Sequence, residues 1–352
     1  MTSKAITAEA AAPYIPVDAD FRLKNSDAIT IDENFAAQSF WKDVFIRFFR
    51  KASAVVGLVL IVLISVLAVV GPNMNEYTYS GQELSQKNLA PRIIALEKFG
   101  IFDGSEKMST TTGTKTVNNY TDKGLTDVEY WFGSDNFGRD IWTRTWSGAR
   151  VSLIIAVAAA IIDMVIGMSY GLISGYFGGK VDMVMQRFLE IANGIPRLVI
   201  VTLLLLVLQP GMLTIIFALM LTEWVGMSRI ARAEMLKLKE QEFVLASRTL
   251  GAGNFFIIFK EVLPNIIGPI ITQVMFSIPT AIFTEAFLSF VGLGIPVPQC
   301  SLGSLISEGF NSFTTHPYQI IPPIVVMALL MLSFNLVADG LREALDPKMK
   351  EM

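Results

Sequence analysis

An uninterrupted apolar run constrains the fold of this chain more than any other feature. From Ala52 to Val70 the sequence reads ASAVVGLVLIVLISVLAVV and carries no charge. An α-helix needs about 20 apolar residues to cross the hydrocarbon layer of a membrane, and this run has that length. Residues 1–40 are polar and slightly acidic, with no basic region at their start and no small-residue cleavage site after the run. We therefore expect the helix to be retained as a membrane anchor.

Five more apolar stretches continue the pattern. Apolar residues make up 52% of the chain and charged residues 17%, against about 25% charged in a typical soluble domain. We therefore predict an all-α polytopic membrane protein with six transmembrane helices. The stretch at Leu198–Leu208 reaches spanning length only if its helix begins near Met183. The further stretches are Val151–Ile173, Leu198–Leu208, Met212 to about Ile230, Ile266–Val291 and Ile320–Ala338.

The second stretch also carries glycines at four-residue spacing, Gly167, Gly171 and Gly175. Residues four apart lie on one helix face, and small residues there let another helix backbone approach closely in lipid. The pattern predicts a tightly packed helix neighbour along this face.

Basic residues divide the predicted connections into two sets. The short loops Gln209–Gly211 and Gly292–Gln319 contain no Lys or Arg, whereas cytoplasmic loops keep basic residues because these resist translocation. We therefore place both termini and the loop 232–265 in the cytoplasm. We place the segment 72–148 outside, together with Cys300, which an impermeant thiol reagent should label. The basic set comprises Arg47, Arg50, Lys51, Lys180, Arg187, Arg229, Arg232, Lys237, Lys239, Arg248, Lys260, Arg342, Lys348 and Lys350.

These assignments divide the chain into consecutive parts. We expect cytoplasmic tails at both ends, a first transmembrane helix, an extracellular insert with a segment leading into the second helix, and a five-helix core. The parts are 1–40 (tail), 41–71 (first helix), 72–148 (insert and pre-helix segment), 149–345 (core with its loop 232–265) and 346–352 (tail).

The composition excludes several classes of chemistry. The chain has one Cys, Cys300, and one His, His316, so it has neither an internal disulfide nor a zinc site of the HExxH or Cys2His2 kind. We therefore predict no catalytic residues and no metal site. A net charge of −3 argues against nucleic acid as a partner. The sequence also lacks a GxxxxGK[ST] phosphate loop, so the chain cannot hold ATP in that manner.

The external insert is rich in turn-forming residues. Thr110-Thr111-Thr112-Gly113 and Asn118-Asn119 are typical of turns and loops, and Pro91–Phe99 could form a short amphipathic helix. The insert is either a solvated segment with a small core or a docking surface for an external partner.

The cytoplasmic loop KLKEQEFVLASRTLGAGNFFIIFKEVLPN has helical periodicity on both sides of Gly251. A glycine suits the left-handed position that ends a helix, and Pro264 suits the first turn of the next helix. The loop is either a protruding helix-glycine-helix element that another protein grips or an ordinary solvated linker.

This loop resembles the EAA loop of permease subunits of binding-protein-dependent ABC importers. The family's glycine and following leucine-proline match Gly251 and Leu263-Pro264. Three other stretches resemble the C-type permease subunit of oligopeptide and dipeptide importers, and the resemblance covers about residues 41–71 and 130–348. These stretches are WFGSDNFGRDIWTRTWSGARVSL (Trp131–Leu153), TEAFLSFVGLGIP (Thr284–Pro296) and FNLVADGLREALDPK (Phe334–Lys348).

The resemblance implies a type I ABC importer permease fold in a bacterial cell membrane. It implies a homologous second permease subunit, two cytoplasmic ATPases that bind ATP and Mg, and an extracellular peptide-binding lipoprotein as partners; this chain itself would bind no cofactor. The substrate would be an oligopeptide, with dipeptides, nickel, a glutathione-like peptide or another small solute as alternatives. The residues implied in ATPase coupling are Glu242, Ala246, Ser247, Gly251, Leu263 and Pro264.

The chain departs from the family pattern in two places. Leu245 stands where the family's loop has a glutamate, and Lys260-Glu261 stands where many relatives have a basic residue and a histidine. We infer that helical shape and Gly251 carry the loop's role. The insert at about 73–130 is longer than the family pattern, so nothing transfers onto it. A stand-alone secondary transporter would need an internal repeat, and a membrane-anchored receptor leaves the six spans unexplained.

Ionisable residues inside a membrane are costly and are functional candidates by default. Asp163 and Glu285 are candidates for the pathway or gate, and Glu223 is a weaker one. The alternatives are hydrogen bonding between core helices for Asp163 and a structural role at the outer gate for Glu285.

The segment before the second span offers candidates for docking the binding protein, Arg139, Asp140 and Arg144. Ser134 or Asp135 can cap a short helix there. Asp140 and Arg144, four residues apart, are expected to pair on one face while Arg139 points elsewhere. The alternative is an interfacial helix that only anchors the second span.

Overall fold

The computed structural model of this chain describes residues 40–110 and 113–345. The predicted tails at 1–40 and 346–352 therefore lie almost wholly outside the described residues, as do Thr111 and Thr112. The described part is mostly helical, as predicted, and contains one two-stranded sheet. The elements are α1 (Phe40–Arg50), α2 (Ala52–Val70), α3 (Ile94–Glu97), β1 (Ser105–Thr110), β2 (Gly113–Asn118), α4 (Asn119–Asp122), α5 (Ile141–Ile162), α6 (Met168–Phe177), α7 (Gly179–Gly194), α8 (Arg197–Val207), α9 (Met212–Thr222), α10 (Trp224–Leu238), α11 (Glu242–Thr249), α12 (Asn254–Phe256), α13 (Leu263–Leu288), α14 (Leu302–Asn311) and α15 (Ile321–Leu345).

Five continuous helical segments of the described chain are long and apolar enough to cross a membrane, and the bent pair α7–α8 makes a sixth if it counts as one span. The apolar run predicted at Ala52–Val70 forms α2, and Gly71-Pro72 follows it. The predicted first helix at 41–71 is not one helix, because Lys51 is extended (φ −86°, ψ 105°) and separates α1 from α2. The other segments extend past the predicted runs into polar sequence. The segments are Ala52–Asn73, Ile141–Phe177, Met212–Leu238, Asn254–Leu293 and Pro317–Leu345.

The predicted third span is not one straight helix. α7 and α8 meet at an angle of 79°, with Ile195 in an extended conformation at φ −85° and ψ 124°. Pro196 follows Ile195, and a proline disfavours helical geometry in the residue before it. The prediction of a single helix from Met183 to Leu208 was therefore wrong at this bond.

Three short π-helical segments lie in two of the long helical segments, Ile141–Phe177 and Asn254–Leu293. Asp163–Gly167 joins α5 to α6, Ile257–Val262 joins α12 to α13, and Ser289–Leu293 follows α13. Such segments widen the helix by one residue and often occur at functional sites. Pro264 lies in the first turn of α13 as predicted, and the π-helical segment Ile257–Val262 joins that turn to α12.

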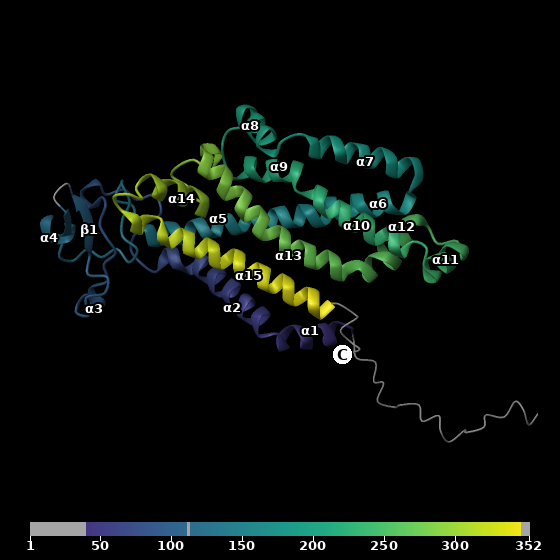
Figure 1. The fold of residues 1–352 in the computed structure, drawn as a ribbon, viewed down its shortest axis with the longest axis horizontal. Coiled ribbons are helices and arrows are strands. Elements are labelled where there is room, and N and C mark those ends of the chain that lie inside the picture. Colours follow the sequence, from purple (N-terminus) through teal and green to yellow (C-terminus); the bar gives the residue numbers. More distant parts are fainter. Residues whose placement is uncertain (1–39, 111–112, 346–352) are drawn as a thin grey trace, which may run out of the picture. The chain divides into compact units, whose positions relative to one another are not determined.

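The glycine face packs against α10 as predicted. A methyl group added to Gly171 would lie 2.2 Å from the carbonyl oxygen of Ser228, and one added to Gly175 would lie 2.9 Å from Cβ of Met235. Only glycine permits backbones to approach this closely. Along the rest of the bundle α2 packs on α15, α15 on α13, and α13 on α5 (Figure 1).

The insert folds around a small core of its own. Leu89, Tyr120 and Tyr130 are buried together, and Tyr77 stacks on Tyr130 at 4.4 Å. β1 and β2 form an antiparallel hairpin that the sequence analysis did not predict. The predicted helix at Pro91–Phe99 is reduced to the single turn α3. The insert lies at the end of the bundle where α14 is found, and α11 lies at the opposite end (Figure 1).

Candidate functional site

The loop between α10 and α13 contains a complete helix stop at Gly251. The Gly251 amide donates to the carbonyl of Arg248 at 3.0 Å, and the Ala252 amide donates to the carbonyl of Ser247 at 3.0 Å. These two bonds form a Schellman motif, which requires a left-handed residue after the helix. Gly251 has φ +83°, so the predicted left-handed glycine is confirmed.

One side of α11 is fixed in a buried core. Val244 is fully buried and packs with Ile257, Ile258 and Val262 in a cluster that also contains residues of α6 and α10. Arg248 lies over the ring of Tyr176 at 5.4 Å, and the Tyr176 hydroxyl donates to Oδ1 of Asn254 at 3.1 Å. A displacement of α11 therefore acts directly on the ends of α6, α10 and the helix that leads to α13.

The other side of the loop exposes large apolar side chains. Leu250 is 88% exposed, Phe255 63% and Leu245 46%. An exposed apolar patch outside the membrane commonly marks a surface that contacts another protein. The structure brings Glu242, Ala246, Ser247 and Gly251 into this one element, while Leu263 and Pro264 lie in the next helical segment.

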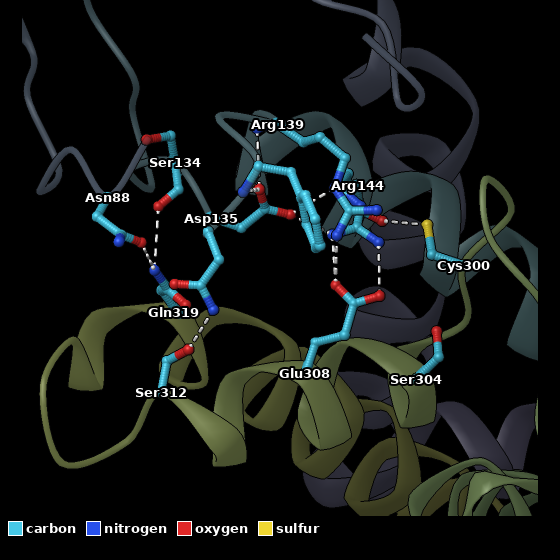
Figure 2. Close-up of polar contacts among 12 residues, drawn as sticks. Asn88, Ser134, Asp135, Arg139, Arg144, Cys300, Ser304, Glu308, Ser312 and Gln319 are labelled. Atoms are coloured by element: carbon cyan, nitrogen blue, oxygen red, sulfur yellow. Dashed lines mark hydrogen bonds and ion pairs between the residues drawn. The ribbon is translucent and has the colours of Figure 1, made fainter. Parts of the chain in front are cut away.

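At the opposite end of the bundle, two arginines and two carboxylates form a compact charge cluster (Figure 2). We call it the outer clamp, because the distribution of basic residues predicts that this end lies outside. Its members are Asp135, Arg139, Arg144 and Glu308. Nε of Arg139 lies 2.6 Å from Oδ2 of Asp135, and its Nη2 lies 2.8 Å from Oε2 of Glu308. Nη1 of Arg144 contacts the same two oxygens at 2.6 and 2.7 Å.

This geometry corrects the predicted pairing of Asp140 with Arg144. Asp140 instead caps α5, where its Oδ2 accepts the Thr143 amide at 2.8 Å and the Asn75 side-chain amide at 2.7 Å. Burial raises the pKa of Asp140. The prediction that Arg139 points away from Arg144 is also wrong, because both arginines contact Asp135 and Glu308 in the outer clamp. Arg139, Asp140 and Arg144 are only 2%, 1% and 1% exposed, so their side chains favour the anchoring interpretation over direct docking.

Glu308 in α14 is the outer-clamp residue that the sequence analysis missed. It lies 164 positions from Arg144 in the chain, and no local pattern marks such a pair. Cys300 is also held here, since its Sγ donates to the carbonyl of Arg144 at 3.4 Å. The thiol is 2% exposed, and burial raises its pKa. The expectation that an impermeant reagent labels it is therefore wrong for the folded chain.

The two predicted intramembrane carboxylates have different surroundings. Glu285 is fully buried and accepts hydrogen bonds from Ser152 at 3.0 Å and Ser289 at 2.7 Å. Asp163 begins the first π-helical segment and is one of the residues that line a cavity of about 250 Å³. The weaker candidate Glu223 also lines this cavity. Its lining further includes Asn193, Thr222, Arg229, Gln273, Ser277 and Thr280.

Comparison with known proteins identifies the family. Residues 167–351 match the family described as binding-protein-dependent transport system inner membrane component. Residues 39–91 match the N-terminal TM domain of oligopeptide transport permease C. The inward-facing MetNI methionine ABC transporter is a distant structural neighbour, with a TM-score of 0.49 and 18% identity over 58% of this chain and 96% of that chain.

Similar proteins match almost end to end. The chain is 41% identical to the oligopeptide transport system permease protein OppC of Bacillus subtilis, over 89% of this chain and 91% of that protein. It is 42% identical to the dipeptide transport system permease protein DppC of Lactococcus lactis, over 94% and 98%. With OppC of Escherichia coli the identity is 33%, over 92% and 98%. The resemblance seen in the sequence is thus confirmed. The chain belongs to the family of binding-protein-dependent transport system inner membrane components, and it is a multi-pass permease subunit of an ABC importer.

Proposed function

We propose that this chain is the C-type permease subunit of an oligopeptide importer. A homologous second permease subunit completes the pathway, an extracellular peptide-binding lipoprotein delivers the substrate, and two cytoplasmic ATPases supply the energy. ATP and Mg bind to the ATPases and this chain binds no cofactor. The named relatives that carry oligopeptides or dipeptides support the substrate class. The basic residues around α11 support a cytoplasmic location for the loop and both termini.

The observation that carries this proposal is the two-sided character of α11. Leu250, which directly follows α11, is 88% exposed, while Val244 within α11 is fully buried. A helix with one free apolar end and one fixed face suits a lever between an ATPase and the bundle. Glu242, Ala246, Ser247 and Gly251 shape this lever, and closure of the ATPase pair on ATP would displace it as a rigid body.

The transported peptide would pass the polar faces of α10 and α13. Gln273, Ser277 and Thr280 are spaced four and three residues apart, so they lie on one face of α13. They line the same cavity as Asp163 and Arg229. Polar side chains that share a face within a membrane span are expected to face protein or water and not lipid.

Crosslinking tests the lever. A cysteine at Leu250 should crosslink to the ATPase in the assembled transporter, and Cys300 gives little background because it is buried. The matched control is a cysteine at Phe99 in the insert, which is 75% exposed and should not crosslink to the ATPase. An ATPase crosslink at Phe99, or none at Leu250, would contradict the assignment of the loop.

Competition tests the substrate. Uptake of a labelled oligopeptide by cells that depend on this chain should fall when unlabelled oligopeptide is added and stay unchanged with nickel. Stronger competition by a dipeptide than by the oligopeptide would favour the alternative substrate.

A further inference from the structure

Glu285 lies among serine hydroxyls from three different structural elements. Ser152 is in α5, Ser289 is in the π-helical segment after α13, and Ser301 precedes α14. Ser152 Oγ donates to Oε2 of Glu285 at 3.0 Å, and Ser289 Oγ donates to Oε1 at 2.7 Å. The hydroxyls of Ser289 and Ser301 are 3.4 Å apart. Glu285, Ser152 and Ser301 are 0% exposed, and Ser289 is 5% exposed.

The same serines hold the first turn of α14. The Leu302 amide donates to Oγ of Ser152 at 3.2 Å. Ser301 and Ser304 exchange backbone-to-side-chain bonds at 3.1 and 2.9 Å in a capping box. The first amides of a helix have no hydrogen-bond partner within the helix. Ser152 supplies the partner for the Leu302 amide, and the Glu285 carboxyl orients the Ser152 hydroxyl for this role.

The start of α14 is also wedged between its neighbours. A methyl group on Gly303 would lie 2.3 Å from Cα of Ala286 in α13, and one on Gly148 in α5 would lie 2.9 Å from the carbonyl carbon of Ser301. At the far end of α14, Glu308 is held by the outer clamp and Ser312 accepts the Asn136 side chain at 2.7 Å (Figure 2). Both ends of α14 are thus fastened to α5 or to the segment before it.

We propose that Glu285 is a positioning residue that holds α5, α13 and α14 together as one outer unit, and that it does so by hydrogen bonding and not by charge. Both hydrogen bonds that we describe for this carboxyl come from hydroxyls, which can donate or accept. An amide in its place can still bridge them. The functional consequence rests on the proposed peptide transport, because peptide uptake is one of its two readouts.

The test compares Glu285→Gln with Glu285→Ala in the assembled transporter. We expect peptide uptake to stay near the parent value in Glu285→Gln. It should fall about tenfold in Glu285→Ala, where the buried hydroxyls of Ser152 and Ser289 lose the acceptor of their hydrogen bonds. A spin label at Phe310 in α14, which is 56% exposed, should become more mobile only in Glu285→Ala. A label at Phe99 in the insert is the control and should not change.

Each outcome bears on the proposal. Equal loss in Glu285→Gln and Glu285→Ala would show that charge or proton binding is required, which overturns the hydrogen-bonding role. Parent-like mobility of α14 in Glu285→Ala would overturn positioning. If that variant does not assemble, Ser152→Ala removes one link alone and must still loosen the label at Phe310. If the parent transporter takes up no peptide, the proposed function fails, and the spin-label comparison still tests Glu285.

Discussion

Removing Glu308 should expose how strongly the outer clamp depends on charge balance. The described cluster holds Arg139 and Arg144 against Asp135 and Glu308. Glu308→Met leaves two guanidinium groups against one carboxylate, and Arg139→Met leaves two carboxylates against one guanidinium. Replacing both residues leaves Arg144 paired with Asp135 at 2.6 Å, which restores neutrality.

The expected loss of unfolding free energy follows from the burial of the two arginines. Arg139 and Arg144 side chains are 3% and 1% exposed, whereas Glu308 is 35% exposed. Removing one partner of a buried ion pair costs about 3–5 kcal/mol, and the partial exposure of Glu308 favours the lower end, about 3 kcal/mol. The double variant Arg139→Met/Glu308→Met should lose about as much as either single variant, so the two sites should couple by about 2–3 kcal/mol.

The assay is the free energy of unfolding of the purified chain in detergent micelles, measured for the parent, both single variants and the double variant. The matched control is Glu190→Met, whose partner Arg187 is 74% exposed, and it should cost less than about 1 kcal/mol. The charge-balance reasoning would be refuted if the double variant lost as much unfolding free energy as the two single variants added together. It would also be refuted if Glu308→Met lost no more than the control Glu190→Met.

Three further changes test other parts of the account. Gly251→Ala should reduce coupled ATPase activity, because a φ of +83° is strained for alanine. Gly253→Ala is the control and should not reduce it, because Gly253 has a φ of −69°. Equal effects of the two variants would contradict a role for the left-handed turn. Gly171→Ala should lower the thermal stability of the chain, because the added methyl group forces α6 away from α10. Gly226→Ala is the control and should not lower it, because a methyl group there has no neighbour within 4 Å. Unchanged stability in Gly171→Ala would contradict the close packing. Cys300 should resist thiol reagents from either side of the membrane and react fully after denaturation, and rapid labelling of the native chain would contradict its burial.

The sequence predicted best those features that one local pattern defines. The bounds of α2 were right because flanking charge and Gly71-Pro72 interrupt the apolar run. The Gly251 turn and the glycine face of α6 were right because each depends on a property that only glycine has.

Features that depend on distant residues could not be predicted. Glu308 joins the outer clamp from another helix. Asp140 caps α5 because this helix begins at Ile141, before the apolar run that predicted it at Val151. The β1–β2 hairpin was missed since its strands are polar and lack an alternating apolar face. The bend at Ile195-Pro196 was missed because the apolar count on either side favoured one span.

Reconstitution tests the central claim most directly. Proteoliposomes that contain this chain, the second permease subunit and the two ATPases should take up a labelled oligopeptide when ATP and the peptide-loaded binding protein are supplied. Uptake should stop when this chain is omitted or when the ATPases are inactivated. Uptake that persists without ATP, or that proceeds without this chain, would contradict its assignment as the ATP-driven permease subunit.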